Sequence, residues 1–358
     1  MQNYILMHGN KEVAYISNKV RLQEIYDIKE MPIGLRDSQN VSLRFPLWLS
    51  HRTIPNNRIF ADCLRKVTGC DFTDAMLRNM SVSITDTYWL KPEGSNLTWE
   101  QINYHDNLFS NEVSNAVIQH LSLSDTSLHP DFTTDGILEK TWILIENKPY
   151  LLKFDDTHDK GQLVGEVYAS RIANILGIPH VPYQMTQVLG RCASVCPCVI
   201  TDSQTDMVHA MQYKWEYRCG SREFFNYLCD IDKSGITKMV AFDVLTHQID
   251  RHEYNFAFAN GQLLPLYDSG RCLSMSRDTR PFCIDRMNQM QLLDELPFDV
   301  PDKSLLFGIY EEVCEAYQVQ PKQEAVDSII RGIAELHLLE KQLDMRRNEN
   351  DSCDTYER

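Results

Sequence analysis

The sequence lacks several features that would place it in common classes of protein. Its first residues, Met1–Leu6, have neither the basic start nor the small-residue cleavage site of a secretion signal. No apolar run approaches the ~20 residues of a membrane span. Basic charge is also scarce, because the formal net charge is −15, and a nucleic-acid surface requires basic patches. We therefore expect a soluble, cytoplasmic chain without direct membrane or nucleic-acid binding.

A disulfide framework also lacks support. The chain has 11 cysteines, an odd number, and no secretion signal, which favours reduced thiols. The densest group, Cys192–Cys198, has no Cys-x-x-Cys partner and no histidine at ligand spacing nearby. A zinc site would need Cys219, Cys229 or His209 to be brought in by the fold. Buried structural cysteines are the alternative that we favour.

What is present is a globular composition, 43% hydrophobic and 24% charged, in a chain long enough for two or three subdomains. The N-terminal part contains strand-like runs and helical stretches. The strand-like runs are Tyr4–Met7, Val13–Ile16 and Val41–Phe45, and the helical stretches are Phe60–Val67 and Ala75–Met80. A basic, turn-forming segment, Arg52–Arg58, is either a phosphate contact or a solvated loop. The polar stretch Ser122–Asp131 indicates a linker or mobile loop.

The most informative stretch is Val244–Gly270. Asn260-Gly261 stands between two apolar runs, which is the strongest short signal for a hairpin. A turn there sets residue 255 roughly opposite residue 266 and returns Asp268 to the open end beside Asn255. Both residues offer hard oxygens, which suit Mg²⁺ bound to phosphate better than zinc.

Asp250 follows an apolar-periodic helix and lies on a loop at the same open end. A carboxylate there can accept the proton of an attacking hydroxyl while Asn255 and Asp268 position the metal and phosphate, which is what phosphoryl transfer requires. The alternative is that Asp250, Arg251 and His252 cap the helix and pair locally.

A second hairpin is predicted at Thr141–Phe154, and it places Lys153 inside an apolar run. Such a lysine is either an edge residue that reaches solvent or a phosphate ligand. A helix follows over Gly161–Leu176. Its Glu166 either pairs with Lys153 or is an exposed first-turn glutamate favoured by the helix dipole. Further helices are expected over 282–293, 303–316 and 324–343.

Together these residues resemble a known family. Asp250-Arg251-His252-x-x-Asn255, followed by Asp268-Ser269-Gly270, resembles the catalytic loop and metal-binding aspartate of the kinase superfold. The form is that of HipA-like and phosphoinositide-kinase-like proteins. The segment Thr134-Asp135-Gly136-x-x-x-Lys140-x-Trp142 resembles the phosphate-loop region of HipA-like proteins.

The resemblance implies an α+β, kinase-like fold of two lobes with an additional N-terminal α/β subdomain. The subdomain would span 1–125, the β-rich nucleotide-binding N-lobe 126–215 and the helical catalytic C-lobe 216–346, with a disordered tail at 347–358. The implied activity is that of a serine/threonine protein kinase of toxin–antitoxin or prophage type, with ATP and Mg²⁺ as cofactors. The partners would be a protein substrate and a small antitoxin.

The resemblance also assigns roles to residues. Lys153, Glu166 and Gly136 would bind the nucleotide, Asp250 would be the catalytic base, and Asn255 and Asp268 would hold the metal. The chain departs from the family pattern in two ways, because it has no glycine-rich G-x-G-x-x-G and has Ser269 where eukaryotic kinases have phenylalanine. Two other classes stay open, a lipid or small-molecule kinase and a non-catalytic kinase-like module that binds a nucleotide or partner.

Overall fold

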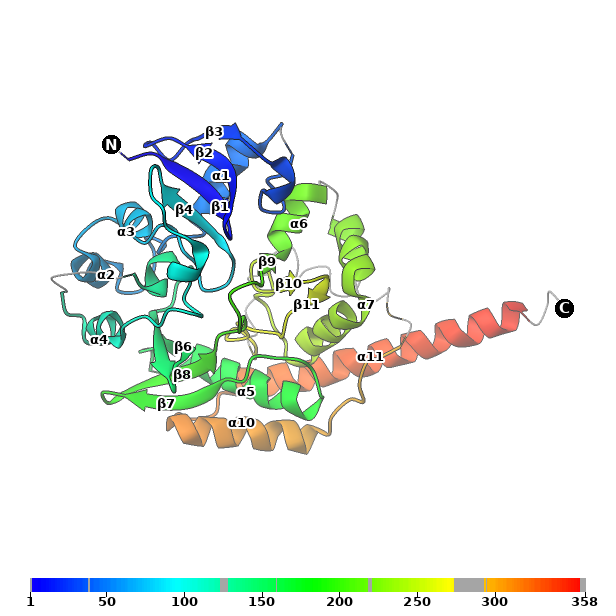
Figure 1. Cartoon of the computed structure of the whole chain (residues 1–358). Helices are drawn as coiled ribbons and strands as arrows, with labels where there is room; N and C mark the ends of the chain where they lie inside the picture. Colours follow the sequence, from blue (N-terminus) through cyan, green and yellow to red (C-terminus); the bar gives the residue numbers. More distant parts are fainter. Residues whose placement is uncertain are drawn as a thin grey trace. The chain divides into compact units, whose positions relative to one another are not determined.

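The computed structural model describes residues 2–37, 39–122, 128–158, 160–217, 221–273, 293 and 295–354. The chain forms two compact units (Figure 1). The first comprises Met1–Asp155 and Val188–Arg218, and the second comprises Asp156–Gln187 and Cys219–Arg358. The strands predicted for an N-lobe therefore share a unit with the N-terminal subdomain, whereas the helix that carries Glu166 belongs to the second unit.

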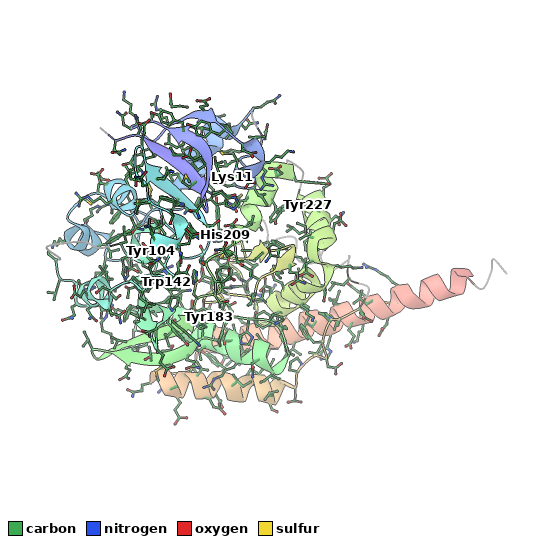
Figure 2. All side chains as sticks on the ribbon, viewed as in Figure 1. Lys11, Tyr104, Trp142, Tyr183, His209 and Tyr227 are labelled. Atoms are coloured by element: carbon green, nitrogen blue, oxygen red, sulfur yellow. The ribbon has the colours of Figure 1, made fainter. Side chains whose placement is uncertain are left out.

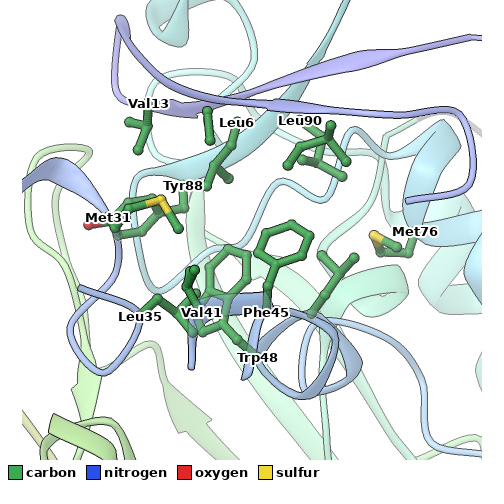
Figure 3. Packing of buried hydrophobic residues seen from close by; sticks show 13 residues of the cluster. Leu6, Val13, Met31, Leu35, Val41, Phe45, Trp48, Met76, Tyr88 and Leu90 are labelled. Atoms are coloured by element: carbon green, nitrogen blue, oxygen red, sulfur yellow. The ribbon is translucent and has the colours of Figure 1, made fainter. Parts of the chain in front are cut away.

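The first unit begins with a four-stranded antiparallel sheet in the order β3-β2-β1-β4. Its strands are β1 (Tyr4–His8), β2 (Lys11–Ile16), β3 (Leu22–Ile25) and β4 (Tyr88–Pro92), with the short helix η1 (Ile28–Glu30) after β3. Figure 3 shows Leu6, Val13 and Leu90 of this sheet facing Phe45 and Trp48. These side chains form the core of the N-terminal part.

Helix α1 (Val41–Ser50) carries Phe45 and Trp48, so the strand predicted at Val41–Phe45 is wrong. A β-branched residue and two large apolar residues in a short run read as a strand. The buried positions, Val41, Phe45, Trp48 and Leu49, instead follow helical spacing. Packing against the sheet therefore outweighs local strand propensity.

A second core in this unit holds the helices α2 (Ala61–Thr68), α3 (Phe72–Arg78) and α4 (Asn111–Gln119) together with the short helix η3 (Pro130–Thr133). Another short helix, η2 (Trp99–Gln101), precedes α4. Asp131 of η3 is 1% exposed and accepts hydrogen bonds from the Trp142 amide, at 2.8 Å, and from Thr141 Oγ1, at 2.6 Å. The end of the stretch expected as a linker is thus built into the core.

Three more strands of this unit pair antiparallel in the order β5-β6-β8: β5 (Lys140–Ile145), β6 (Lys148–Phe154) and β8 (Arg191–Pro197). The predicted hairpin is confirmed, with Lys140 directly opposite Lys153. Trp142, labelled in Figure 2, lies on β5 and is buried. The unit ends with β9 (Val208–His209) and α6 (Ala210–Tyr217).

Among its described residues, the second unit contains four helices and three short strands. The helices are α5 (Gly161–Ile175), α7 (Ser221–Leu245), α10 (Lys303–Tyr317) and α11 (Gln323–Asp354). The strands are β10 (Ala257–Ala259), β11 (Gln262–Leu263) and β7 (Gln184–Val188), and the last residue of β7 belongs to the first unit. Helix α10 packs against α5, and α11 packs against α7. The helices predicted at 303–316 and 324–343 are confirmed. The one predicted at 282–293 lies outside the described residues, apart from Leu293.

The last helix is longer than the sequence indicates. Helix α11 continues to Asp354, into the segment from residue 347 that was expected to be a disordered tail. The added residues are polar but include good helix formers such as glutamate, and extending an existing helix is much easier than starting one. Within the described ranges, no helix combines the length and the apolar character that a membrane span needs.

Candidate functional site

Arg251 is the centre of the polar network in the second unit. It is 1% exposed, and its five N–H donors all have acceptors. Nε and Nη2 donate to the Asp243 carboxylate at 3.0 Å, and Nη2 also donates to Ser269 Oγ at 3.1 Å. Nη1 donates to the carbonyl oxygens of Asn255, at 2.8 Å, and Tyr267, at 2.7 Å. One guanidinium thus joins helix α7, the loop after it and the segment around Asp268.

Asp243 explains how a charged arginine is stable in this interior. Burial alone would lower the pKa of Arg251, but the charge and hydrogen bonds of Asp243 raise it above the ordinary value. The pair is buried on both sides, since the two side chains are 1% and 5% exposed. The interpretation of local pairing is therefore right for Arg251, and that pairing builds the frame of the site.

The hairpin predicted at Asn260-Gly261 is confirmed. Phe258 pairs with Leu263 and Ala259 with Gln262, and the Leu264 amide donates to the Ala257 carbonyl, which is the register expected from the turn. Both turn residues have positive φ, +51° and +74°, as a type I′ turn requires. The two ends of the hairpin return together, which brings Asn255 and the residues next to Asp268 to the same guanidinium.

Asn255 is buried with a defined orientation. Its Nδ2 donates to the Asp250 carbonyl at 2.7 Å, and its own amide donates to the His252 carbonyl at 2.8 Å. The first bond identifies the nitrogen end of the side-chain amide, so Oδ1 is left as the end that can act as a metal ligand.

Asp268 has a backbone conformation that is uncommon outside glycine. Its φ is +54°, a region in which aspartate and asparagine are the better tolerated non-glycine residues. Its amide donates to Tyr183 Oη at 3.3 Å, and its carbonyl accepts from Gln248 Nε2 at 3.2 Å. Backbone strain of this kind persists where surrounding contacts impose it, often at functional positions.

Asp250 is connected to Asp268 through Gln248. The Asp250 amide donates to Gln248 Oε1 at 3.3 Å, so the two ends of one buried side-chain amide bind the backbones of both aspartates. The Asp250 side chain is 18% exposed, and Arg271 Nη1 lies 3.9 Å from its Oδ1. The carboxylate is therefore held in place by its backbone while retaining some access to solvent.

Helix α5 crosses the Asp268-Ser269-Gly270 segment at closely approaching backbones. A Cβ on Gly165 would lie 2.6 Å from the Gly270 carbonyl oxygen, and one on Gly270 would lie 3.3 Å from Glu166 Cγ. Glu166 is 1% exposed and lies in the second turn of α5, so the alternative of an exposed first-turn glutamate is wrong. Its expected pairing with Lys153 joins residues of two separately described units and stays a prediction.

In the first unit, Lys153 lies on the central strand β6 and is 3% exposed. The alternative of an edge lysine that reaches solvent is therefore wrong. Lys140, directly opposite, is also buried. Two ammonium groups on the same face of a sheet repel each other and favour an anion nearby.

No protein-family profile matches the sequence, and no curated protein matches it by sequence. Among solved structures, HipA of Shewanella oneidensis MR-1, in a complex of this toxin–antitoxin system with HipB and operator DNA, matches with a TM-score of 0.50 and 14% identity. The match covers 94% of this chain and 91% of that HipA. The chain has a HipA-like kinase fold.

Two further solved structures match with lower scores. The Helicobacter pylori proinflammatory kinase CtkA covers 60% of this chain and 92% of its own length, at 14% identity and a TM-score of 0.39. A thermostable mutant of the aminoglycoside phosphotransferase APH(4)-Ia covers 57% and 90%, at 9% identity and a TM-score of 0.22. The HipA-like fold follows from the match to the Shewanella oneidensis HipA.

The donor atoms fit magnesium better than a metal enclosed by protein ligands. Among the described residues, no group of three or more histidine, cysteine, aspartate or glutamate side chains could hold a metal ion. Mg²⁺ commonly takes only one or two protein ligands and completes its shell with phosphate and water. The amide oxygen of Asn255 and the carboxylate of Asp268 are ligands of the kind that magnesium takes, and their sharing of one ion stays a prediction.

Four residues of this network escaped the sequence analysis as functional positions: Asp243, Gln248, Arg251 and Gly165. Asp243 lies inside an apolar-periodic helix and Gln248 lies just after its end. Polar residues at such positions usually indicate the solvent-exposed face of a helix. Gly165 left a usable signal, because glycine inside a helix is unfavourable unless another backbone approaches closely.

Proposed function

We propose that the chain is an ATP- and Mg²⁺-dependent phosphotransferase, specifically a HipA-like serine/threonine protein kinase of toxin–antitoxin or prophage type. The observation that carries the proposal is the set of hydrogen bonds made by the five donors of Arg251. They place Asn255 and the neighbours of Asp268 around one buried cation, beside the loop of Asp250. A HipA-like fold supports the same assignment.

In this proposal each polar residue has one task. The Asp250 carboxylate accepts the proton of the substrate hydroxyl as its oxygen attacks the γ-phosphorus and ADP leaves. Asn255 and Asp268 would hold Mg²⁺, which would neutralise phosphate charge. In the first unit, Lys153 contacts the nucleotide phosphates and Gly136 gives the phosphate loop its turn.

The proposed substrate is a protein and the proposed partner a small antitoxin. The HipA of Shewanella oneidensis forms a complex with HipB and operator DNA. With a net charge of −15, this chain itself would contribute little to binding DNA, so contact with DNA would be made by the partner.

The test is Mg·ATP binding by calorimetry, with autophosphorylation followed in the same samples. Asp268→Asn is the informative variant, because asparagine also tolerates positive φ, so the backbone is preserved while a metal-binding charge is lost. Asp327→Asn, on the exposed side of α11, makes the same chemical change away from the site and serves as the control.

We expect Mg-dependent binding and phosphate transfer in the wild type and the control, and loss of both in Asp268→Asn. Binding without transfer would instead favour a non-catalytic module or a missing partner. Transfer to a lipid or small molecule but not to protein would favour the second kinase class. A folded wild-type chain that binds no nucleotide would contradict the proposal.

A further inference from the structure

The segment Thr134–Gly136 of the first unit is held by cationic side chains along its whole length. Arg58 donates from Nη2 to the Thr134 carbonyl and from Nε to the Gly136 carbonyl, the latter at 3.0 Å. Lys140 Nζ donates to the carbonyl between them, that of Asp135, at 3.1 Å. Three consecutive carbonyl oxygens therefore accept hydrogen bonds from two cations.

This arrangement fixes the direction of the backbone amides. In a trans peptide the N–H points opposite to the C=O. With the three carbonyls bound to Arg58 and Lys140, the N–H groups that follow them are directed away from these cations. One of them, that of Gly136, donates to a carboxylate oxygen of Asp135 at 2.6 Å. The amide side of the segment thus already donates to an anionic oxygen, as a phosphate loop must.

Gly136 leaves no room for another residue in this arrangement. Its φ is +108°, and a Cβ there would lie 2.0 Å from Lys140 Nζ. The sequence has no glycine-rich loop, and Gly136 is nearly alone in this region. In a G-x-G-x-x-G loop, several glycines allow the backbone amides to turn toward phosphate. In this segment the side chains of Arg58 and Lys140 orient the amides instead, through the carbonyl oxygens that they bind.

Arg58 itself comes from the basic segment for which the sequence left two alternatives, a phosphate contact or a solvated loop. It is 3% exposed, so the solvated alternative is wrong for this residue. Burial lowers the pKa of Arg58 to about 10, against the opposing charges of Asp131 and Asp135. Its Nη1 is buried and has no hydrogen-bond acceptor among the described residues. An arginine needed only for packing would not retain a desolvated donor, since an apolar side chain of similar length fills the same space.

We propose that Arg58 is a positioning residue of the nucleotide site, which holds the Thr134–Gly136 segment so that its amides face the phosphates. The proposal rests on the proposed function, because it takes this segment to be the phosphate loop. Arg58 acts through the backbone carbonyls that it binds, and its effect is confined to the phosphate part of the ligand.

The test compares Arg58→Met and Arg58→Lys with Arg65→Met, a half-exposed arginine of the neighbouring helix α2 that pairs with Asp62. Dissociation constants are measured for Mg·ATP, Mg·ADP and adenosine. Hydrogen exchange of the amides of residues 135–137 is followed separately in the absence of nucleotide, so that the loop is examined independently of binding.

We expect Arg58→Met to weaken Mg·ATP and Mg·ADP by about 10-fold, the loss of one charge-assisted contact, and to leave adenosine unchanged. Lysine keeps the charge but lacks the planar fork whose Nε and Nη2 reach the two carbonyls, so Arg58→Lys is intermediate. Amide exchange at 135–137 becomes faster in Arg58→Met. The Arg65→Met control resembles the wild type in every measurement.

Equal weakening of all three ligands would indicate general destabilisation and would overturn the proposal, as would unchanged exchange at 135–137. If the wild-type chain binds no nucleotide, the proposed function fails and the positioning role fails with it. Faster exchange in Arg58→Met would then show a clamp that is structural only, which separates the two failures.

Discussion

Arg251 concentrates the geometry of the candidate site in one side chain. It binds Asp243 on a helix, two carbonyl oxygens on either side of a hairpin and a serine hydroxyl. A lysine could not replace it, because the five donors of a planar guanidinium leave in fixed directions and an ammonium has three. The identity of this residue therefore matters as much as its charge.

Replacing Arg251 by methionine should strongly destabilise the second unit. The change leaves the buried Asp243 carboxylate without its cation, a loss of about 3–5 kcal/mol in systems of this kind. Urea unfolding followed by far-ultraviolet circular dichroism, which reports on the helices that dominate this unit, measures the loss.

Two further variants decide whether the buried charge is the cause. Arg331→Met, at an exposed i,i+4 pair on α11, should change the unfolding free energy by less than about 0.5 kcal/mol. The double variant Arg251→Met with Asp243→Leu removes both charges, so it should be more stable than Arg251→Met alone. A double variant that is less stable would contradict this account.

His8 makes the first unit sensitive to pH. Its ring stacks on Tyr88, and its two nitrogens lie 2.7 Å from carboxylate oxygens of Glu30 and Asp206. Burial acts to lower the pKa of His8, but the two carboxylates, Asp206 first, raise it above 6.5. The charged imidazole then contributes its full share of the free energy of unfolding below pH 6.5. This contribution is lost as the pH rises through the pKa that His8 has in the folded state.

The measurement is the unfolding midpoint of the wild type and of His8→Gln across pH 5.5–9. The wild type should exceed the variant most at the acid end, and the difference should shrink as the pH rises. A titration of the His8 ring by NMR gives the folded-state pKa directly. A difference that grows with pH would contradict the assignment of a raised pKa.

At the scale of elements, the crossing of α5 over the Asp268–Gly270 segment depends on glycine. Alanine at position 165 would place a Cβ 2.6 Å from a backbone oxygen, which no side-chain rotation relieves. We expect Gly165→Ala to cost about 1–3 kcal/mol by overpacking and to displace Gly270. Thermal unfolding of the purified variant measures the cost.

Helix α10 offers the matched control. Gly308 lies in the middle of that helix and a Cβ there meets no atom within 4 Å. Gly308→Ala should therefore be neutral or stabilising by up to about 1 kcal/mol, since alanine is the better helix former. If both variants lost similar stability, close backbone contact would not be the reason for the loss at position 165.

The elements that the sequence predicted well are those defined by local chemistry. Asn260-Gly261 specified its hairpin and register because few residues tolerate two consecutive positive φ angles. The helix at Val41 was misread because its identity depends on a sheet supplied partly by residues 88–92. Local pattern cannot report a partner element from a distant part of the chain.

At the scale of the whole molecule, the motif indicated the kinase-like fold, whereas the supporting contacts were not predictable. Asp250, Asn255 and Asp268 stood out through their spacing. The buried pair Asp243–Arg251 joins residues 8 positions apart. The hydrogen bonds of Arg58 to Thr134 and Gly136 join residues 76 and 78 positions apart. No sequence pattern indicates either contact. The division into units also follows packing, which assigns α5 to the helices of the second unit.

The span of the Arg251 network has a consequence for how the protein is made. Asp243 and Arg251 leave the ribosome before Tyr267 and Ser269, and the five donors find all their acceptors only after Ser269 has emerged. Until then the arginine is best satisfied by water, and the loop of Asp250 has no fixed frame. The chain therefore completes its candidate site only after Ser269 has emerged, and a chain that ends before Tyr267 lacks two of the acceptors that Arg251 binds.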